Sequence, residues 1–178
     1  MRKKISEQIR IPEGVNVYAD SHSLKLNKGG VELEKRIYYP VKIEGNIIKV
    51  ECEKPTKKQK KLIKSTAAHI RNLIAGLDKK YVYKLQICAV HFPITATVKG
   101  EDFVVKNFLG ERKERITKIL PGVHVKIDKE VITVESADKE KAGQTSANIE
   151  NVTRIVNRDR RIFQDGIFIV EKNKGAKR

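Results

Sequence analysis

The sequence predicts an α+β protein built from two tandem copies of a small domain, each with an antiparallel or mixed β-sheet packed on one α-helix. Residues 41–51 (VKIEGNIIKVE) and 125–135 (VKIDKEVITVE) are identical at six of eleven positions, at a constant offset of 125 − 41 = 84. Both segments alternate apolar and polar residues as strands do, and an apolar stripe with helical spacing follows each of them. We therefore expect an N-terminal domain at residues 1–81 and a C-terminal domain with a basic tail at residues 82–178.

The first half begins with an expected strand at residues 15–18 and continues to a β-hairpin at residues 41–51. Gly45-Asn46 supplies the turn, because this dipeptide tolerates the backbone angles of a tight hairpin. A helix is expected to begin after Thr56, whose side chain can cap it while Gln59, three residues later, completes a capping box. The buried face of this helix is predicted to consist of Ile63, Ala67, Ile70, Ile74 and Leu77.

The second half repeats this order with weaker signals. Its opening strand is expected at residues 94–98, and its hairpin turn, Asp128-Lys129-Glu130, has no glycine, so we expect a different loop type. Asp138 is the predicted cap of a second helix, because a carboxylate can accept from the free amides of the first turn. The apolar stripe of this helix is predicted to consist of Ala142, Thr145, Ile149, Val152 and Val156.

Two further strands are predicted, at residues 83–90 and 167–170. The offset of 84 matches Tyr83 with Ile167 and Leu85 with Ile169, so we expect the second strand to repeat the first. Only His91-Phe92-Pro93 separates the first of these strands from the opening strand of the second half. No flexible linker is therefore expected between the domains.

The chain carries 38 Lys and Arg against 22 Asp and Glu, a formal net charge of +16. A balance of this size indicates a polyanionic partner, usually nucleic acid or an anionic membrane surface. No apolar run approaches the roughly 18 residues that span a bilayer, and the N-terminus MRKKISEQIRIPEG lacks the apolar core of a signal peptide. We therefore expect a cytoplasmic protein that binds nucleic acid and no membrane.

Metal, cofactor and catalytic sites are not expected. Cys52 and Cys88 are predicted to be free buried thiols, since each lies in or beside a strand pattern and the chain shows no export signal. The four histidines are scattered, without CxxC, HxxxH or HExxH spacing. The sequence contains no GxSxG, GxxxxGKS, GxxxxGKT or GxGxxG motif, so we expect no enzyme, no cofactor and no small-molecule substrate.

Three basic stretches are candidates for the anion-binding surface: residues 54–64, 106–118 and 152–178. For the first, a solvated helix face and RNA contact both remain open, because lysine is the ordinary surface residue of a helix. The third is rich in arginine, whose planar guanidinium can hold a phosphate in two places. Only 6% of residues are aromatic and none is Trp, so we expect folded RNA, held through phosphates and shape rather than by stacked single strands.

Residues 104–127 (VVKNFLGERKERITKILPGVHVKI) and 137–172 (ADKEKAGQTSANIENVTRIVNRDRRIFQDGIFIVEK) resemble the universal large-subunit ribosomal protein six family in its archaeal and eukaryotic form. The resemblance extends over essentially the whole chain, tandem repeat included. It implies a structural constituent of the large ribosomal subunit that supports translation, without enzymatic activity. It also implies that the second domain binds large-subunit (23S) rRNA near the factor-binding region, by the sarcin–ricin loop and the stalk base, beside neighbouring large-subunit ribosomal proteins.

Two parts of the family pattern carry over by position. The helix-opening Asp-Lys and the following Gly-Gln correspond to Asp138-Lys139 and Gly143-Gln144, and the late RNA-binding segment corresponds to residues 158–166. Bacterial members have a KGKG loop there, which this chain lacks, so the resemblance transfers the region rather than single contacts. The alternatives are an RNA-binding module outside the ribosome and a protein-interaction adaptor. The residues expected to bind RNA are Arg112, Lys113, Arg115, Lys139, Arg154, Arg158, Arg160, Arg161, Gln164, Lys172, Lys174, Lys177 and Arg178.

Overall fold

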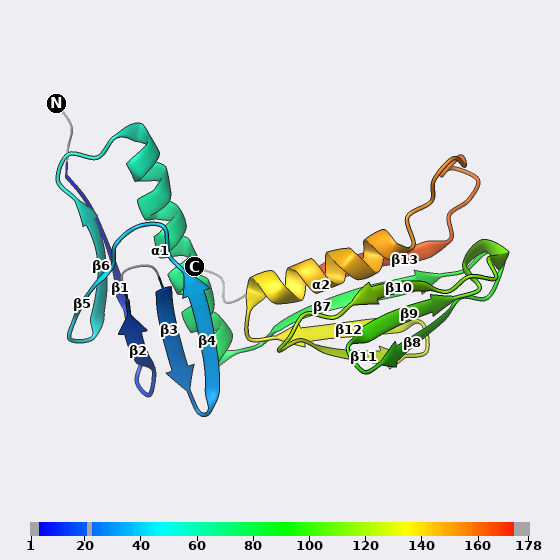
Figure 1. Ribbon diagram of the computed structural model, residues 1–178, viewed down its shortest axis with the longest axis horizontal. Coiled ribbons are helices and arrows are strands. Elements are labelled where there is room, and N and C mark those ends of the chain that lie inside the picture. The colour runs from blue at the N-terminus through cyan, green and yellow to red at the C-terminus, as the bar shows by residue number, and fades with distance from the viewer. Residues whose placement is uncertain (1–3, 21–22, 173–178) are drawn as a thin grey trace. The chain divides into compact units, whose positions relative to one another are not determined.

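The structure is a computed structural model that describes residues 4–20 and 23–172, and it divides into two compact units between Lys79 and Lys80 (Figure 1). The predicted α+β class is confirmed, because the described strands pair antiparallel and two α-helices pack on them. Each unit contains two separate sheets where a single sheet was expected. We call residues up to Lys79 unit 1 and the residues from Lys80 onward unit 2.

The described residues of unit 1 form two three-stranded sheets and one helix. One sheet has the strand order β1-β6-β5 and the other the order β2-β3-β4. The predicted hairpin at residues 41–51 is confirmed, with Ile43 opposite Ile48 across the two-residue turn Gly45-Asn46. The strands are β1 (Ile5–Arg10), β2 (Asn16–Ala19), β3 (Ser23–Lys28), β4 (Val31–Arg36), β5 (Lys42–Glu44) and β6 (Ile47–Cys52).

Helix α1 (Lys57–Asp78) begins where the capping box was predicted. The Thr56 hydroxyl accepts from the Gln59 amide at 3.2 Å, and the Gln59 side chain accepts from the Thr56 amide at 2.9 Å. These bonds satisfy two of the free amide groups of the first turn. The buried residues of α1 are Ile63, Thr66, Ala67, Ile70, Leu73, Ile74 and Gly76, so the predicted stripe is largely confirmed.

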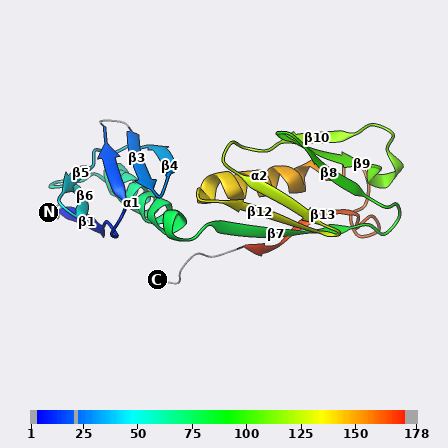
Figure 2. The ribbon, with the colours of Figure 1, turned by 90° about the horizontal axis from the view of Figure 1, so that it is seen from below.

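Unit 2 contains a three-stranded sheet of order β10-β9-β8 and a four-stranded sheet of order β11-β12-β7-β13. Helix α2 (Lys139–Val152) packs on β7, β12 and β13 of the larger sheet and on β10 of the smaller one (Figures 1 and 2). The strands are β7 (Tyr81–Cys88), β8 (Thr95–Lys99), β9 (Asp102–Lys106), β10 (Arg115–Lys118), β11 (His124–Asp128), β12 (Val131–Ser136) and β13 (Gly166–Lys172), and a 3-10 turn, η1 (Phe108–Gly110), follows β9.

The strands predicted at residues 83–90 and 167–170 are both present, as β7 and β13, but they do not occupy matching places in the two units. In unit 1, β1 pairs with β6, and Ile9 lies opposite Ile48. In unit 2, β7 pairs with β12 in the same way, and Leu85 lies opposite Ile132. Strand β7 therefore occupies in unit 2 the place that β1 occupies in unit 1. Strand β13 instead adds to the free side of β7. The offset of 84 between these two strands therefore reflects similar alternation in neighbouring strands, and β13 has no counterpart in the described part of unit 1.

Helix α2 ends earlier than the apolar stripe suggested. Asp138 caps it as predicted, since its carboxylate accepts from the Glu140 amide at 2.8 Å. Ala142, Thr145 and Ile149 are buried, but Val156 lies beyond the last helical residue and is 69% exposed. The second hairpin also differs from expectation, because its turn has the same two-residue length as the first, and Lys129 (φ 54°) takes the left-handed angle of Gly45 (φ 56°).

The core of unit 2 lies between α2 and the two sheets. It includes Phe103 and Phe108 from the smaller sheet side, and Leu85, Ile132 and Ile167 from the larger sheet, all essentially inaccessible to solvent. Burial of each such side chain contributes roughly 1.5–3 kcal/mol. This core fixes the end of α2 and the beginning of β13, between which the arginine-rich segment runs.

Candidate nucleic-acid interface

Residues 153–165, which we call the arginine loop, connect the end of α2 with the beginning of β13. The loop carries four exposed arginines: Arg154, Arg158, Arg160 and Arg161. It projects at one end of unit 2, between α2 and β13 (Figures 1 and 2). The sequence predicted these arginines as RNA ligands, and the structure places all four on one short segment.

The loop is fixed at its first residue by Thr153, which is buried. The Thr153 hydroxyl donates to the Glu150 carbonyl at 3.1 Å and accepts from the Ile167 amide at 2.9 Å. Because the amide belongs to β13, these bonds hold the end of α2 against the strand on which the loop finishes. Glu150 makes a second connection between α2 and β13, because its carboxylate accepts from the Ile169 amide at 3.1 Å.

The loop is fixed at its last residue by Asp165, whose side chain is 1% exposed. Its carboxylate accepts from the backbone amides of Val90 at 2.6 Å and His91 at 2.9 Å, and it also contacts the His91 ring. Burial disfavours the charged carboxylate, but the hydrogen bonds from His91 and Val90 outweigh this and lower the pKa of Asp165. These partners lie 74 and 75 residues away in the chain, so no local sequence pattern indicates them.

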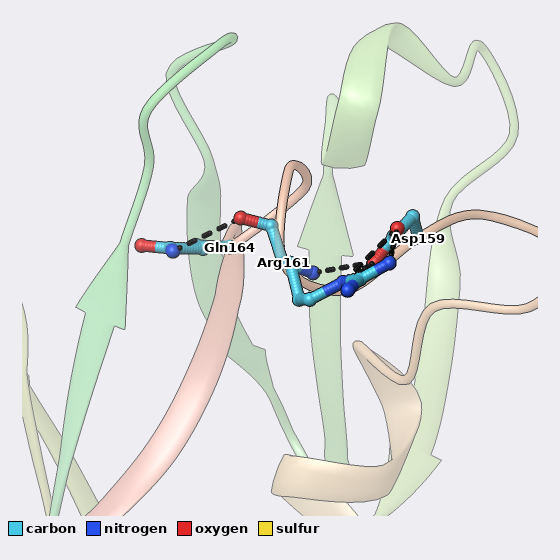
Figure 3. A network of polar contacts seen from close by, with 3 residues as sticks. All are labelled: Asp159, Arg161 and Gln164. Atoms are coloured by element: carbon cyan, nitrogen blue, oxygen red, sulfur yellow. Dashed lines mark hydrogen bonds and ion pairs between the residues drawn. The ribbon is translucent and has the colours of Figure 1, made fainter.

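Asp159 organises the middle of the loop. Its carbonyl accepts from the amides of Ile162 at 3.1 Å and Phe163 at 2.9 Å, and its carboxylate accepts from the Arg161 amide at 2.9 Å. The Arg161 guanidinium also donates to this carboxylate, at 2.8 Å from Nη2, which lowers the pKa of Asp159 (Figure 3). Gln164 donates to the Arg161 carbonyl at 3.2 Å on the other side of the turn.

Aromatic rings support the side of the loop that carries Arg158. The Arg158 guanidinium lies 4.9 Å from the centre of the Phe163 ring, and the same ring lies 5.1 Å from the His91 ring. A guanidinium over an aromatic face is attracted by its quadrupole, typically by 0.5–1 kcal/mol where solvent is near. Phe163 therefore supports the guanidinium of Arg158.

Arg115 was predicted to bind RNA, but the structure shows its guanidinium engaged within the protein. It donates to both oxygens of Glu111, at 2.6 and 2.8 Å, and to the carbonyls of Val152 at 2.9 Å and Arg154 at 3.2 Å. It also lies 4.4 Å from the centre of the Phe108 ring. The hydrogen bond from Arg115 lowers the pKa of Glu111. Arg115 thus satisfies carbonyls at the end of α2 and holds the beginning of the arginine loop.

Arg112 and Lys113 lie in the neighbouring loop between η1 and β10, and both are exposed. No ion pair joins either of them to a carboxylate among residues 4–20 and 23–172. The Phe92 ring packs 3.5 Å from the position that a side chain at Gly110 would take, which ties this loop to the His91 segment. The two loops therefore share one support, and we call their exposed cations, with Gln164, the basic end of unit 2.

The remaining predicted residues lie elsewhere. Lys139 is the first residue of α2, about 20 Å along the helix from the arginine loop, and its ammonium lies 5.8 Å from the centre of the Tyr81 ring. Lys172 pairs with Tyr83 at the far end of β13. Lys174, Lys177 and Arg178 fall outside the described residues. The described residues of the predicted set therefore form one cluster at the basic end, with Lys139 and Lys172 lying apart from it.

Other kinds of site receive no support from the described residues. No group of three His, Cys, Asp or Glu side chains among them could hold a metal ion, and none of their helices is long and apolar enough to cross a membrane. Cys52 and Cys88 are free, as predicted, but they are half-buried rather than buried.

Comparisons with known proteins place the same region in a family context. A family model described as Ribosomal protein L6 matches residues 92–166, which include the arginine loop and the loop of Arg112. The chain is 40% identical over 171 residues to the large ribosomal subunit protein uL6 of Methanococcus vannielii, covering 94% of each chain. It is 39% identical over 172 residues to the large ribosomal subunit protein uL6 of Aeropyrum pernix, also covering 94% of each.

Proposed function

Since the chain belongs to the ribosomal protein L6 family, and is thus a structural, non-enzymatic protein of the large ribosomal subunit, we propose that it binds 23S rRNA through the basic end of unit 2. The resemblance seen in the sequence is confirmed by these relatives. The place of the protein is accordingly the cytoplasmic ribosome, where it acts in translation.

Net charge alone does not select unit 2. Residues 1–79 carry 18 − 9 = +9 and residues 80–178 carry 20 − 13 = +7. The two units differ in the type of basic residue. Unit 2 has seven arginines and unit 1 has four, and four of the seven lie on the arginine loop. Arginine can hold a phosphate through two parallel hydrogen bonds, so a cluster of guanidinium groups favours the RNA backbone more than scattered lysines do.

The observation that carries the proposal is a rigid loop with unpaired cations. Thr153 and Asp165 fix both ends of the loop through hydrogen bonds, so little conformational entropy remains to be lost on binding. Among the described residues, no carboxylate forms an ion pair with Arg154, Arg158 or Arg160, whereas Arg161 is paired with Asp159. The three guanidinium groups are therefore available to phosphates without first breaking an ion pair, and the Phe163 ring beneath Arg158 leaves its N–H groups free to donate.

The scaffold that presents this end is proposed to be the second of two tandem copies of one domain, divided near residues 79–81. The support is the shared order of a first strand, a three-stranded meander, a hairpin and a helix in both units. In the second copy, β13 is an addition that carries the end of the arginine loop back onto the sheet.

Within the ribosome, we place the contact in the factor-binding region, by the sarcin–ricin loop and the stalk base, as the family resemblance implies. Neighbouring large-subunit proteins at the stalk base are then further partners. The role would be to hold the folded RNA in the shape on which translation factors dock. A chemical footprint of the full chain on 23S rRNA tests this placement, and protection confined to other helices of the RNA would contradict it.

The binding surface is tested by measuring the affinity of the full chain for a 23S rRNA fragment across salt concentrations. If ~6 phosphates are neutralised, the affinity falls roughly a thousandfold between 50 and 200 mM salt. The double variant Arg158→Gln, Arg160→Gln should reduce the slope of log affinity against log salt by about 1.8. The control Lys57→Gln, Lys61→Gln removes the same charge from the exposed face of α1 and should leave most of the affinity in place.

Equal losses in both double variants would show that charge, and not the basic end, determines binding, and would refute the proposed surface. Sedimentation distinguishes the alternatives to a ribosomal role. The protein should travel with the large subunit at low salt and be released at high salt. A free RNA-binding module or a protein-interaction adaptor would stay in the soluble fraction at both.

A further inference from the structure

An open cleft of about 930 Å³ lies beside the arginine loop, bounded also by the last turn of α2 and by residues of β7 and β13. Its exposed margin includes Arg154, Arg160 and Gln164, and its half-buried part includes Ile155 and Phe168. Cations at the margin can bind an anionic group, and apolar side chains inside can pack against a flat apolar body. The cleft therefore suits a ligand that has both parts. A cleft of this size falls in the range that holds small organic molecules.

Two carboxylates line the cleft, and Asp165 is already engaged by Val90 and His91, so Glu150 is the one that narrows the choice of ligand. Glu150 is half-buried, and one of its carboxylate oxygens accepts from the Ile169 amide at 3.1 Å. A carboxylate is only an acceptor, so it repels a phosphate but can accept from the amino group of a nucleobase. Asn151, exposed on the last turn of α2, adds an amide that can donate and accept. A phosphate therefore belongs at the arginine margin and a base in the interior.

We propose that this cleft receives one unpaired nucleotide of the bound RNA, with its phosphate at Arg154 and Arg160 and its base in the half-buried part beside Phe168. The inference rests on the proposed RNA binding and adds a specificity to it. In a fully paired A-form helix the bases are stacked and cannot leave the helix without loss of pairing. A bulged nucleotide can be turned out and packed on apolar side chains. The basic end would then distinguish bulged from regular helices.

The test uses the full chain and two RNA hairpins of the same sequence, one fully paired and one with a single bulged adenosine. The bulged hairpin should bind about tenfold more tightly, the effect of one additional stacked base. The variant Asn151→Trp fills the cleft while keeping every arginine in the sequence, and it should abolish this preference, so that the two hairpins bind with equal affinity. Gln144→Trp is the matched control, because it lies two turns earlier on the same side of α2 and outside the cleft.

A second measurement needs no variant. Cys88 lines the cleft, whereas Cys52 lies in unit 1, and both are free, half-buried thiols. The rate of alkylation of each cysteine by iodoacetamide is measured with each hairpin present at saturation. The bulged hairpin should slow the reaction of Cys88 severalfold relative to the paired hairpin, and the rate at Cys52 should be the same with both.

The outcomes separate this inference from the proposed function. Equal affinity for the two hairpins, with equal rates at Cys88, would overturn the nucleotide site while RNA binding through the basic end still stands. Failure to bind either hairpin or the 23S rRNA fragment would instead overturn the proposed function itself. If Asn151→Trp does not fold, the alkylation of the natural chain decides the question.

Discussion

The substitution Asp165→Asn tests whether the arginine loop is held by its buried carboxylate. This side chain is 1% exposed and accepts from the backbone amides of Val90 and His91. Both amides donate to the same oxygen, Oδ1, whereas Oδ2 contacts the His91 ring, so the substitution makes the shared acceptor neutral and replaces Oδ2 by an amide nitrogen. Hydrogen bonds to a charged group contribute about 1.5–3 kcal/mol each, against about 1 kcal/mol for bonds between neutral groups. We expect unit 2 to lose about 2–3 kcal/mol of its free energy of unfolding. For a domain of this size, that lowers Tm by roughly 10–20 °C.

Urea unfolding and amide hydrogen exchange followed by mass spectrometry measure the effect. Exchange should increase at Val90 and His91 and across the arginine loop, and stay unchanged in α1. Asp159→Asn is the control, because it makes the same chemical change in the same loop at a carboxylate that is 40% exposed, and it should cost much less. Equal stability of Asp165→Asn and the natural chain, with unchanged exchange at Val90, would refute the reasoning.

The pH dependence of this effect follows from the lowered pKa of Asp165. Because the folded pKa lies below the unfolded value of about 3.9, the carboxylate stabilises the folded state fully above the unfolded pKa. This contribution is lost as the pH falls through the folded pKa. The difference in unfolding free energy between the natural chain and Asp165→Asn should therefore be constant above about pH 5 and shrink below about pH 4.

Three further outcomes are expected. Arg115→Lys removes the guanidinium that donates to Glu111 and to two carbonyls, so unit 2 should lose about 2 kcal/mol of its free energy of unfolding, measured in urea. Its RNA affinity should fall less than that of Arg160→Gln. Asp159→Asn releases Arg161, so filter binding should show severalfold higher RNA affinity and a steeper salt dependence. Thr56→Ala removes the capping box of α1 and should cost about 1 kcal/mol without changing RNA affinity.

The local parts of the fold could be predicted from the sequence because their signals are local. The first hairpin requires only the turn residues Gly45-Asn46 between two alternating segments. The capping box requires only Thr56 and Gln59, which lie three residues apart. Strands β2 and β8 were predicted as opening strands, but β1, β3 and β10 were not assigned, and the division of each unit into two sheets was missed, because alternation does not show which sheet a strand joins. The extra strand β13 was misassigned, because alternation identifies a strand but not its neighbour.

The sequence predicted the candidate site as a region, and the structure shows which contacts each of its residues makes within the protein. Arginine content alone indicated residues 152–178, and the structure gathers Arg154, Arg158 and Arg160 there as unpaired cations. Arginine content could not show that the Arg115 guanidinium is hydrogen-bonded to Glu111 and to a carbonyl at the end of α2. It also could not show that Lys139 lies at the opposite end of α2 from the arginine loop, because the number of charged residues in a segment does not give their positions in the fold.

The sequence by itself determined the α+β class, the hairpins, both helix starts and the demand for an anionic partner, since each depends on residue type and on spacing within a few positions. Only the tertiary structure decided which cations are free. Asp165 reaches back 75 residues to Val90, and Arg115 reaches forward 37 residues to Val152. A guanidinium or carboxylate acts on whatever the fold brings within about 3 Å, and that neighbour is set by packing rather than by order along the chain.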